Sequence, residues 1–371
     1  MLSIACVGGA RGKIRGHVLL SLSKSVKVVD LFCGMGGLTI GALQAAKELK
    51  LNFEIGFACD IDRATSNFYS KNFKKYLSKY HQGDISELIS DDFLSSTTAF
   101  ERDIAGSLAG TDFLFAGPPC QGHSNLNNHS RREDPRNALY LSTIKLIQIC
   151  APKYFIIENV PSVIHSKESV IEKSKSLLLS YGYDVEEIVV EFKLLGVPQS
   201  RKRHVMFGSL KNNLQAVVGD IYTNEKVMLC DVLTDLIGVE SNSIFDSSSK
   251  MSATNLKRAD FLYANDLYDL PNELRPPCQQ GQHSYKSMYG RLKWKEMAQT
   301  ITGGFGSMGQ GRFLHPIEKR VITPHEAARI QGLPDWLDYT DVTKRSDLQK
   351  MIGNAVPPAL SKRFVLSTQG R

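Results

Sequence analysis

The sequence predicts an α/β fold: a mostly parallel sheet with helices on both faces, followed by a second, smaller and irregular domain. Short apolar runs alternate with helical segments from residue 27 to about residue 210, which is the pattern of repeated βα units. Several of these runs end in glycine, proline or an acid, as strands do at the ligand-binding edge of a parallel sheet. Beyond residue 211 this period is lost, and residues 241–252 are rich in serine.

Length and composition permit two domains and exclude several classes of protein. With 371 residues, 42% of them hydrophobic, the chain can bury one large core and a smaller one. The formal net charge of +7 suits a polyanionic partner. No apolar run approaches the ~20 residues of a membrane span. Residues 1–26 lack the basic and apolar regions of a signal peptide, so we expect an N-terminal extension there.

The seven cysteines are scattered, odd in number and free of any Cys-x-x-Cys pair. Neither a zinc site nor a disulfide framework is therefore expected, and we predict a cytoplasmic protein without a metal.

The first βα unit carries a glycine turn. Residues 27–32 are typical of a strand, residues 33–41 hold four glycines, and residues 42–49 are typical of a helix. Glycine lets the backbone approach a ligand, and a helix N-terminus offers free N–H groups to an anion. The dinucleotide fingerprint G-x-G-x-x-G would need glycine where Thr39 stands, which counts against NAD or FAD. The alternative is a tight βα connection without a ligand.

The second unit ends in an acid. Residues 53–59 alternate as a strand and lead to Asp60, where such folds hold a ribose. The alternative is that Asp60 caps a helix over residues 64–73. A third strand is expected to end at Asp84 and Ile85, close to where an adenine edge would lie.

The apolar run at residues 113–116 stops at Gly117-Pro118-Pro119, because proline has no N–H to donate to a ladder. Cys120 therefore follows a strand at the carboxyl edge of the sheet, which favours a catalytic thiol over a buried structural cysteine. Cys278 repeats the Pro-Pro-Cys-Gln string without a strand before it, so we interpret it as a loop residue.

The segments after Cys120 repeat this design. Residues 121–137 are polar and long enough to act as a lid over the thiol. The next strand, residues 154–161, ends in a polar tip and a proline, and its Glu158 is expected to face Cys120 rather than cap a helix. A helix over residues 166–180 and a strand over residues 184–192 follow.

Arg201 and Arg203 lie two residues apart at the entrance of a further strand, so both side chains can point to one face. They are candidates for the electropositive setting that a thiolate needs. The alternative is a solvated basic edge.

The second domain contains a basic and aromatic segment. Between residues 284 and 320, seven basic residues stand against two acidic ones, with five aromatic residues interleaved and five glycines within residues 303–311. This composition suits phosphates, bases and a close backbone approach to a groove. The alternative is a solvated basic face with a flexible loop.

Regular structure is expected to return at Thr323, which begins a capping box with proline at the first helical position, and Gly332 is expected to end that helix. A Gly353-Asn354 turn would lead into a terminal helix from about Pro357.

In this order, the motifs resemble those of the bacterial DNA cytosine-5 methyltransferases over nearly the whole of residues 28–364. Residues 30–37 are similar to the family's S-adenosylmethionine loop, residues 118–121 to its nucleophile motif, and residues 158–160 to its cytosine-binding acid motif. Gln199-x-Arg201-x-Arg203, the helix after Thr323 and Gly353-Asn354-Ala-Val also match. Ile61 stands where the family often has an aromatic residue.

The resemblance implies a Rossmann-like S-adenosylmethionine-dependent methyltransferase sheet and an irregular target-recognition domain. It divides the chain into an N-terminal extension (1–26), a catalytic and cofactor-binding domain (27–210), a target-recognition domain with a hinge helix (211–340) and a C-terminal segment that returns to the catalytic domain (341–371). The implied reaction is methylation of carbon 5 of a flipped-out cytosine in a specific DNA sequence, through a covalent Cys120 adduct.

The resemblance also implies roles for single residues. The catalytic residues would be Cys120, Gln121, Glu158, Arg201 and Arg203. S-adenosylmethionine would be held by Asp30, Phe32, Gly34, Gly36, Gly37, Asp60, Ile61, Asp84, Ile85, Pro119 and Asn354. DNA contacts are expected from Ser124, Arg136, Arg291, Lys293, Thr300 and Arg312. The implied partners are double-stranded DNA and a cognate restriction endonuclease that forms no stable complex with this chain, which is expected to be a monomer.

Two other functions stay open. A related RNA methyltransferase would share the cysteine and cofactor motifs, but such enzymes carry a short Cys-Phe-Thr signature and a small recognition segment, which this sequence lacks. A non-catalytic DNA-binding relative would need a changed Cys120 or Glu158, and both are intact.

Overall fold

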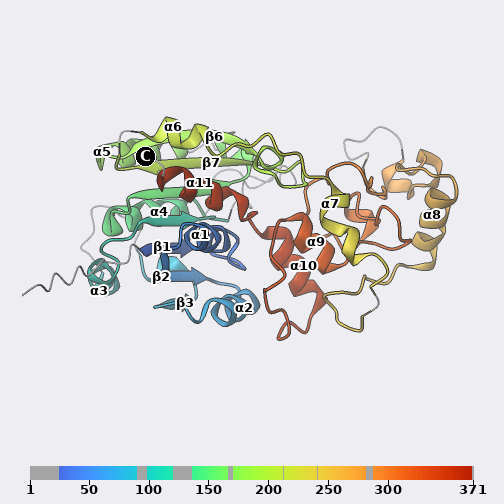
Figure 1. Cartoon of the computed structure of the whole chain (residues 1–371), viewed down its shortest axis with the longest axis horizontal. Helices are drawn as coiled ribbons and strands as arrows, with labels where there is room; N and C mark the ends of the chain where they lie inside the picture. The colour runs from blue at the N-terminus through green and yellow to red at the C-terminus, as the bar shows by residue number, and fades with distance from the viewer. Residues whose placement is uncertain are drawn as a thin grey trace, which may run out of the picture.

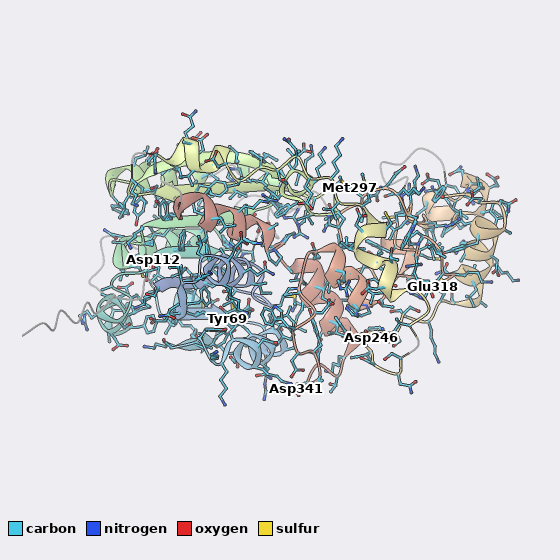
Figure 2. The ribbon with its side chains drawn as sticks, in the orientation of Figure 1. Tyr69, Asp112, Asp246, Met297, Glu318 and Asp341 are labelled. Atoms are coloured by element: carbon cyan, nitrogen blue, oxygen red, sulfur yellow. The ribbon has the colours of Figure 1, made fainter. Side chains whose placement is uncertain are left out.

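The computed structural model describes residues 25–89, 98–119, 136–165, 170–211, 213–239, 241–280 and 287–369. Within these ranges the chain forms a sheet lobe and a second, less regular lobe, which follow one another along the long axis of the molecule (Figure 1). Tyr69 lies in the sheet lobe, whereas Asp246 and Glu318 lie in the second lobe (Figure 2).

The described strands form one sheet in the order β3-β2-β1-β4-β5-β7-β6. Strands β1 to β5 run parallel, whereas β7 runs antiparallel to both β5 and β6. The predicted mostly parallel sheet is therefore confirmed. The strands are β1 Ser25–Leu31, β2 Asn52–Asp60, β3 Tyr80–Gln82, β4 Phe113–Ala116, β5 Tyr154–Asn159, β6 Asp184–Glu191 and β7 Lys202–Ser209.

The strand order reverses between β1 and β4. The chain runs outward from β1 to β3 and then returns to place β4 on the other side of β1. Leu31 pairs with Ala116, and Ala116 pairs with Ile157, so the carboxyl ends of β1, β4 and β5 lie level. Ligands of open α/β sheets bind at such a reversal, outside the carboxyl ends of the strands.

Each face of the sheet is covered by helices, which explains the continuous apolar run of β4. Phe113 and Phe115 join the core that contains α1 and α11, whereas Leu114 and Ala116 join the core that contains α4 and α5. The helices of the sheet lobe are α1 Gly37–Glu48, α2 Arg63–Phe73, α3 Ala99–Ser107, α4 Arg136–Cys150, α5 Val170–Ser180, α6 Leu214–Gly219 and α11 Ala359–Gln369.

Helix α1 begins at Gly37, five residues earlier than predicted. Gly37 and Gly41 are helical because the C-terminal segment packs directly on them. A Cβ at Gly37 would lie 2.0 Å from the Val356 carbonyl oxygen, and one at Gly41 would lie 2.1 Å from that of Pro358. The close contact between α1 and α11 therefore needs glycine at both positions (Figure 1).

The second lobe has few regular elements and a small core of its own. That core consists of Ala259, Leu262, Leu270, Met308, Leu314 and Val321. Its helices are α7 Leu229–Leu233, α8 Ala253–Ala264, α9 Pro324–Ile330 and α10 Arg345–Asn354.

Two of these helices test predictions. Helix α9 has the predicted capping box: Thr323 accepts the Glu326 N–H, and Glu326 accepts the Thr323 N–H. The predicted turn at Gly353-Asn354 is wrong, because both residues form the last turn of α10 and the chain becomes extended only at Ala355.

Candidate active site

The loop after β1 combines unusual backbone conformations with open space. Phe32 and Gly34 both have φ of 53°, and Gly36 has φ of 90°. A Cβ at Gly34 would meet nothing within 4 Å, whereas one at Gly36 would lie 2.5 Å from the Phe73 ring. A positive φ is costly for phenylalanine, and such strain concentrates at functional sites. Gly34 is thus the glycine of this loop that leaves room for a ligand, while Gly36 and Gly37 are required for packing.

Asp60 ties this loop to the end of β2. Its Oδ2 accepts the Gly34 N–H at 2.9 Å and its Oδ1 accepts the Asp62 N–H at 2.8 Å. Burial raises the pKa of this carboxyl group, which the two N–H donors partly offset. The alternative that Asp60 caps the next helix is wrong, because Asp62 is the N-cap of α2 and accepts the Thr65 N–H.

The other predicted cofactor contacts differ in exposure. Ile61 is 67% exposed, which is unusual for a large apolar side chain, and it directly follows the half-buried Asp60. Ile85 is buried in the core, and Asp84 caps the short 3-10 helix Ile85–Glu87. Asn354 is exposed at the end of α10, one turn after Lys350, whose Nζ lies 2.5 Å from Asp62 Oδ2. Helix α10 therefore reaches the acidic loop after β2.

Thr39 takes part in a buried network that sequence reasoning missed. Its hydroxyl donates to Asp30 Oδ2 at 2.6 Å and lies 2.7 Å from the hydroxyl of Tyr69. All three side chains are buried, and burial raises the pKa of Asp30 to about 7. From the sequence, Thr39 is interpreted only as the residue that breaks the dinucleotide fingerprint. A hydroxyl within an apolar helical run could have indicated a buried hydrogen-bond partner.

The ends of β4 and β5 are joined by polar contacts. Asn159 Nδ2 donates to the Pro118 carbonyl oxygen at 3.3 Å, and a Cβ at Gly117 would lie 3.7 Å from Glu158 Oε2. The Glu158 carboxylate therefore lies beside the segment that leads into Cys120. Pro118 is buried and Pro119 is exposed. Cys120, Gln121, Ser124, the proposed lid and the side chain of Arg136 lie outside the described part of the structure.

Glu158 is held by the antiparallel strand β7. Its Oε1 lies 2.8 Å from Nε of Arg203, and the two side chains are 10% and 17% exposed. Removal from water strengthens such an ion pair, and losing one partner would leave the other charge poorly solvated. The arrangement can present an oriented carboxylate to a ligand above β4 and β5.

Arg201 has different partners from Arg203. Its Nη1 donates to the carbonyl oxygens of Gly353 at 3.1 Å and Ile301 at 3.3 Å, and the residue is 2% exposed. The alternative of a solvated basic edge is wrong for this residue.

Four of the described cysteines are poor candidates for a catalytic thiol: Cys33, Cys59, Cys150 and Cys278. Cys33, Cys59 and Cys150 are buried, and burial raises the pKa of Cys59 and of Cys150 to about 12. Cys278 is exposed in the short 3-10 helix Pro277–Gln279, with no strand before it, as predicted. A buried thiol with a raised pKa is a poor nucleophile.

The predicted DNA contacts of the second lobe are largely paired within it. Arg291 Nη1 lies 3.0 Å from Asp266 Oδ1, and its guanidinium lies over the ring of Tyr263. Arg312 Nη2 lies 2.5 Å from Asp269 Oδ1. Both aspartates lie before residue 284, outside the basic segment. The count of charges within that segment therefore left out the acids that neutralise two of its arginines.

Lys293 is more accessible than these arginines. Lys293 is 42% exposed and lies 2.9 Å from Glu296, and Thr300 is half-buried. The arginine side chains, by contrast, are 12% and 16% exposed at positions 291 and 312.

One group in the second lobe has the spacing of metal ligands. One ligand atom each from His315, Glu318 and Glu326 lie within 4.8 Å of one another. Arg320 already supplies a cation, since its Nη2 lies 2.6 Å from Glu326 Oε1 and also pairs with Glu318. His315 Nδ1 accepts two main-chain N–H groups, so its proton is on Nε2, where a metal would have to bind. We therefore interpret the group as an ion-pair cluster.

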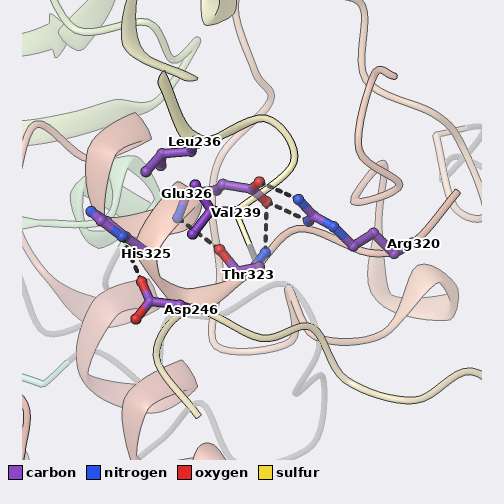
Figure 3. Close-up of a pocket in the computed structure, with 7 residues that line it drawn as sticks. All are labelled: Leu236, Val239, Asp246, Arg320, Thr323, His325 and Glu326. Atoms are coloured by element: carbon purple, nitrogen blue, oxygen red, sulfur yellow. Dashed lines mark hydrogen bonds and ion pairs between the residues drawn. The ribbon is translucent and has the colours of Figure 1, made fainter. Parts of the chain in front are cut away.

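In a pocket next to this cluster, the polar side chains of the lining also bind one another (Figure 3). Its polar side chains pair with one another, as in the 2.8 Å contact between His325 Nδ1 and Asp246 Oδ1. The pocket is lined by Leu236, Val239, Asp246, Arg320, Thr323, His325 and Glu326. It lies in the second lobe, away from the sheet edge.

In the described ranges, no helix is both long and apolar enough to cross a membrane.

Comparisons with known proteins agree along nearly the whole chain. Residues 26–368 match the family model described as C-5 cytosine-specific DNA methylase. The chain is 41% identical over 347 residues to Type II methyltransferase M1.BsuMI of Bacillus subtilis strain 168, which covers 93% of this chain and 80% of the relative. It is 29% identical to Type II methylase M.HgiDII of Herpetosiphon aurantiacus, with 90% and 92% covered.

Solved structures show the same architecture. A crystal structure from E. coli, described as a DNA modification methyltransferase encoded within a prophage, has a TM-score of 0.64 at 26% identity and covers 93% of this chain and 99% of that one. The S. pombe Dnmt2 methyltransferase has a TM-score of 0.65 at 18% identity, with 94% and 99% covered, a likeness that concerns the fold alone.

Proposed function

The chain belongs to the C-5 cytosine-specific DNA methylase family, and we propose that it methylates carbon 5 of cytosine within a specific sequence of duplex DNA, with S-adenosylmethionine as methyl donor. One observation carries the proposal: the glycine loop after β1, the segment leading into Cys120 after β4 and the Glu158–Arg203 pair meet at one sheet edge. A cofactor and a base bound there would lie side by side.

The cofactor loop suits a nucleoside with a charged tail. Gly34 leaves open space, the half-buried Asp60 carboxylate can accept hydrogen bonds from ribose hydroxyls, and Ile61 offers an exposed apolar surface beside it. Asp30, Phe32, Asp84, Pro119 and Asn354 complete the proposed set of contacts. S-adenosylmethionine would supply a methyl group on a sulfonium centre, which leaves as a neutral thioether.

Cys120 is the proposed nucleophile. A thiol with a pKa of ~8.5 is only a few per cent ionised at neutral pH, so the site must favour the thiolate. Its Sγ forms a bond to carbon 6 of the cytosine, while Glu158, held by Arg203, hydrogen-bonds ring nitrogen 3 and the exocyclic amine. Electron density then moves to carbon 5, which takes the methyl group. Loss of the carbon 5 proton and cleavage of the Sγ–carbon 6 bond release the product and restore the thiolate.

Because the reacting carbons are stacked inside the duplex, we propose that the target base is flipped out, at a cost of a few kcal/mol. Gln121, Ser124, Arg136 and the rest of the segment 121–137 would close behind it. In the second lobe, Lys293 is accessible for DNA contact and the half-buried Thr300 would contribute a hydroxyl, whereas Arg291 and Arg312 would act by shaping the surface that meets the DNA.

The setting proposed for this reaction is a restriction-modification system. Both relatives named above are Type II enzymes, so we propose a cognate restriction endonuclease that cleaves the same site and forms no stable complex with this chain. The enzyme would act as a monomer in the cytoplasm.

Methyl transfer from labelled S-adenosylmethionine tests the proposal. Purified wild-type protein is expected to label duplex DNA and not transfer RNA. Cys120→Ser should abolish labelling, whereas the matched control Cys278→Ser should label at the wild-type rate. Labelling of transfer RNA alone would favour an RNA methyltransferase, and labelling by Cys120→Ser would reject the nucleophile.

A further inference from the structure

A closed ring of buried polar groups joins the two lobes. The Ile301 N–H of the second lobe donates to Gln199 Oε1 at 2.8 Å. Gln199 Nε2 donates to Gln331 Oε1 at 2.7 Å, and Gln331 Nε2 donates to the Ile352 carbonyl oxygen at 2.7 Å. Gln199 and Gln331 are fully buried. Three parts of the chain that are distant in sequence are thereby connected: the entrance of β7, the irregular segment around residue 301, and helices α9 and α10.

Arg201 closes the ring. Its Nη1 donates both to Gly353, the residue after Ile352, and back to Ile301. Both polar groups of Ile301 are therefore held, its N–H by Gln199 and its carbonyl by Arg201. A buried donor or acceptor that lacks a partner costs free energy, because water cannot replace the missing hydrogen bond. The ring therefore favours one placement of the three segments relative to one another.

The ring lies next to Arg203 in the sequence, and Arg203 pairs with the Glu158 carboxylate. Gln199, Arg201 and Arg203 alternate, and the third of them pairs with Glu158. The same short segment thus holds the second lobe and the acid. Additional main-chain contacts stiffen it, since the Ser200 N–H donates to the Ala298 carbonyl oxygen at 2.9 Å and the Ala298 N–H donates to that of Pro198 at 2.9 Å.

We propose that Gln199 and Arg201 are positioning residues, which fix the second lobe and the DNA on it relative to the Glu158–Arg203 pair. In this assignment Arg201 does not act as the positive charge that favours the Cys120 thiolate. The proposal rests on the proposed function, because it concerns how target DNA is aligned with that site.

Substitutions of Arg201 can distinguish a positioning role of this side chain from an effect of its positive charge. Arg201→Lys keeps the charge but falls about one bond short of the two carbonyl oxygens, and Arg201→Gln removes the charge. Misalignment should lower kcat/KM for DNA roughly 10- to 100-fold in both variants, with the pH dependence of kcat unchanged. The matched control is Arg363→Lys, because Arg363 Nε donates to the Leu195 carbonyl oxygen within the sheet lobe and should tolerate the change.

A charge role makes the opposite prediction. Near-normal activity in Arg201→Lys, together with a shift of the kcat profile to higher pH in Arg201→Gln, would overturn the proposal. The wild-type rate is the test of methyl transfer itself, so an inactive wild-type protein would reject the proposed function and not the ring.

Hydrogen exchange provides a readout that does not depend on activity. Gln199→Leu should speed exchange of the Ile301 amide roughly tenfold or more, while the Leu314 amide in the core of the second lobe stays protected. Unchanged protection of Ile301 would show that the ring does not hold this segment. Lost protection with wild-type kcat/KM would show that the ring does not position DNA.

Discussion

At the scale of single residues, two aspartates at the end of β2 divide two tasks. Asp62 caps α2 and pairs with Lys350, whereas Asp60 accepts N–H groups from Gly34 and Asp62. From the sequence, Asp60 could either bind a ribose or cap the next helix. Only the structure separates these two roles, because the first residue of the helix decides which aspartate is its N-cap, and α2 begins at Arg63, directly after Asp62.

Asp60→Ala should weaken S-adenosylmethionine binding roughly 10- to 100-fold, since charge-assisted hydrogen bonds contribute about 1.5–3 kcal/mol. Isothermal calorimetry measures the dissociation constant. Asp62→Ala is the matched control: it removes the helix cap and should lower the thermal midpoint with a much smaller effect on affinity. An unchanged dissociation constant in Asp60→Ala would remove this residue from the cofactor site.

Asp30 should make stability depend on pH. Burial raises the pKa of its carboxyl group from 3.8 to about 7, so between these values the folded state holds a proton that the unfolded state has lost. The free energy of unfolding contributed by Asp30 is therefore fully present below about pH 4 and is lost as the pH rises toward 7. The stability of Asp30→Asn relative to wild type should then increase from pH 5 to pH 8. Urea unfolding at both values measures this difference, and a gap independent of pH would contradict it.

At the scale of elements, close packing explains why most positions of the loop after β1 and of the start of α1 need glycine. From the sequence, ligand binding would explain these glycines equally well. Gly36, Gly37 and Gly41 each lack room for a side chain because of other parts of the protein, and only Gly34 faces open space. Composition cannot make this distinction, since the packing partners Phe73, Val356 and Pro358 lie far away in the sequence.

Gly353→Ala should destabilise the protein by about 1–3 kcal/mol, because a Cβ there would lie 2.3 Å from the Thr302 carbonyl carbon and 2.2 Å from Gly303 N. The matched control is Gly303→Ala, where the nearest atoms lie at 3.7 Å and the change should be nearly neutral. Thermal unfolding compares the two. Equal midpoints would mean that α10 does not pack as closely on this segment as described.

The mostly parallel sheet and the positions of β4 and β5 could be predicted because local signals encode them. An apolar run, a polar tip and a proline mark β4 and β5, and the alternating βα pattern implies a parallel sheet. The junction ring could not be predicted. Gln331 carries no local signal of function, and its partners Gln199 and Ile352 are identified only by the packing of α9 and α10 against the sheet lobe.

At the scale of the whole molecule, the second lobe is irregular yet internally paired. Arg291 and Arg312 hold the loop at residues 266–269, and a small core supports them. We propose that this lobe selects the target sequence, whereas the chemistry takes place at the sheet edge.

Exchanging residues 211–320 with the matching segment of a relative that methylates another site should transfer the target site. The cofactor affinity should stay within about threefold, because Asp60 and the glycine loop lie outside the exchanged segment. Calorimetry and mapping of methylated sites measure the two properties. Retention of the original target site would place recognition outside this segment.

The central claim is that this protein methylates carbon 5 of cytosine in a defined DNA sequence, with Cys120 as nucleophile. Bisulfite sequencing of DNA from cells that express the wild-type protein, compared with cells that express Cys120→Ser, tests it most directly. We predict protected cytosines that share one sequence context in the wild type and none in the variant. Protection in both, absence in both, or protection without a shared context would contradict the account.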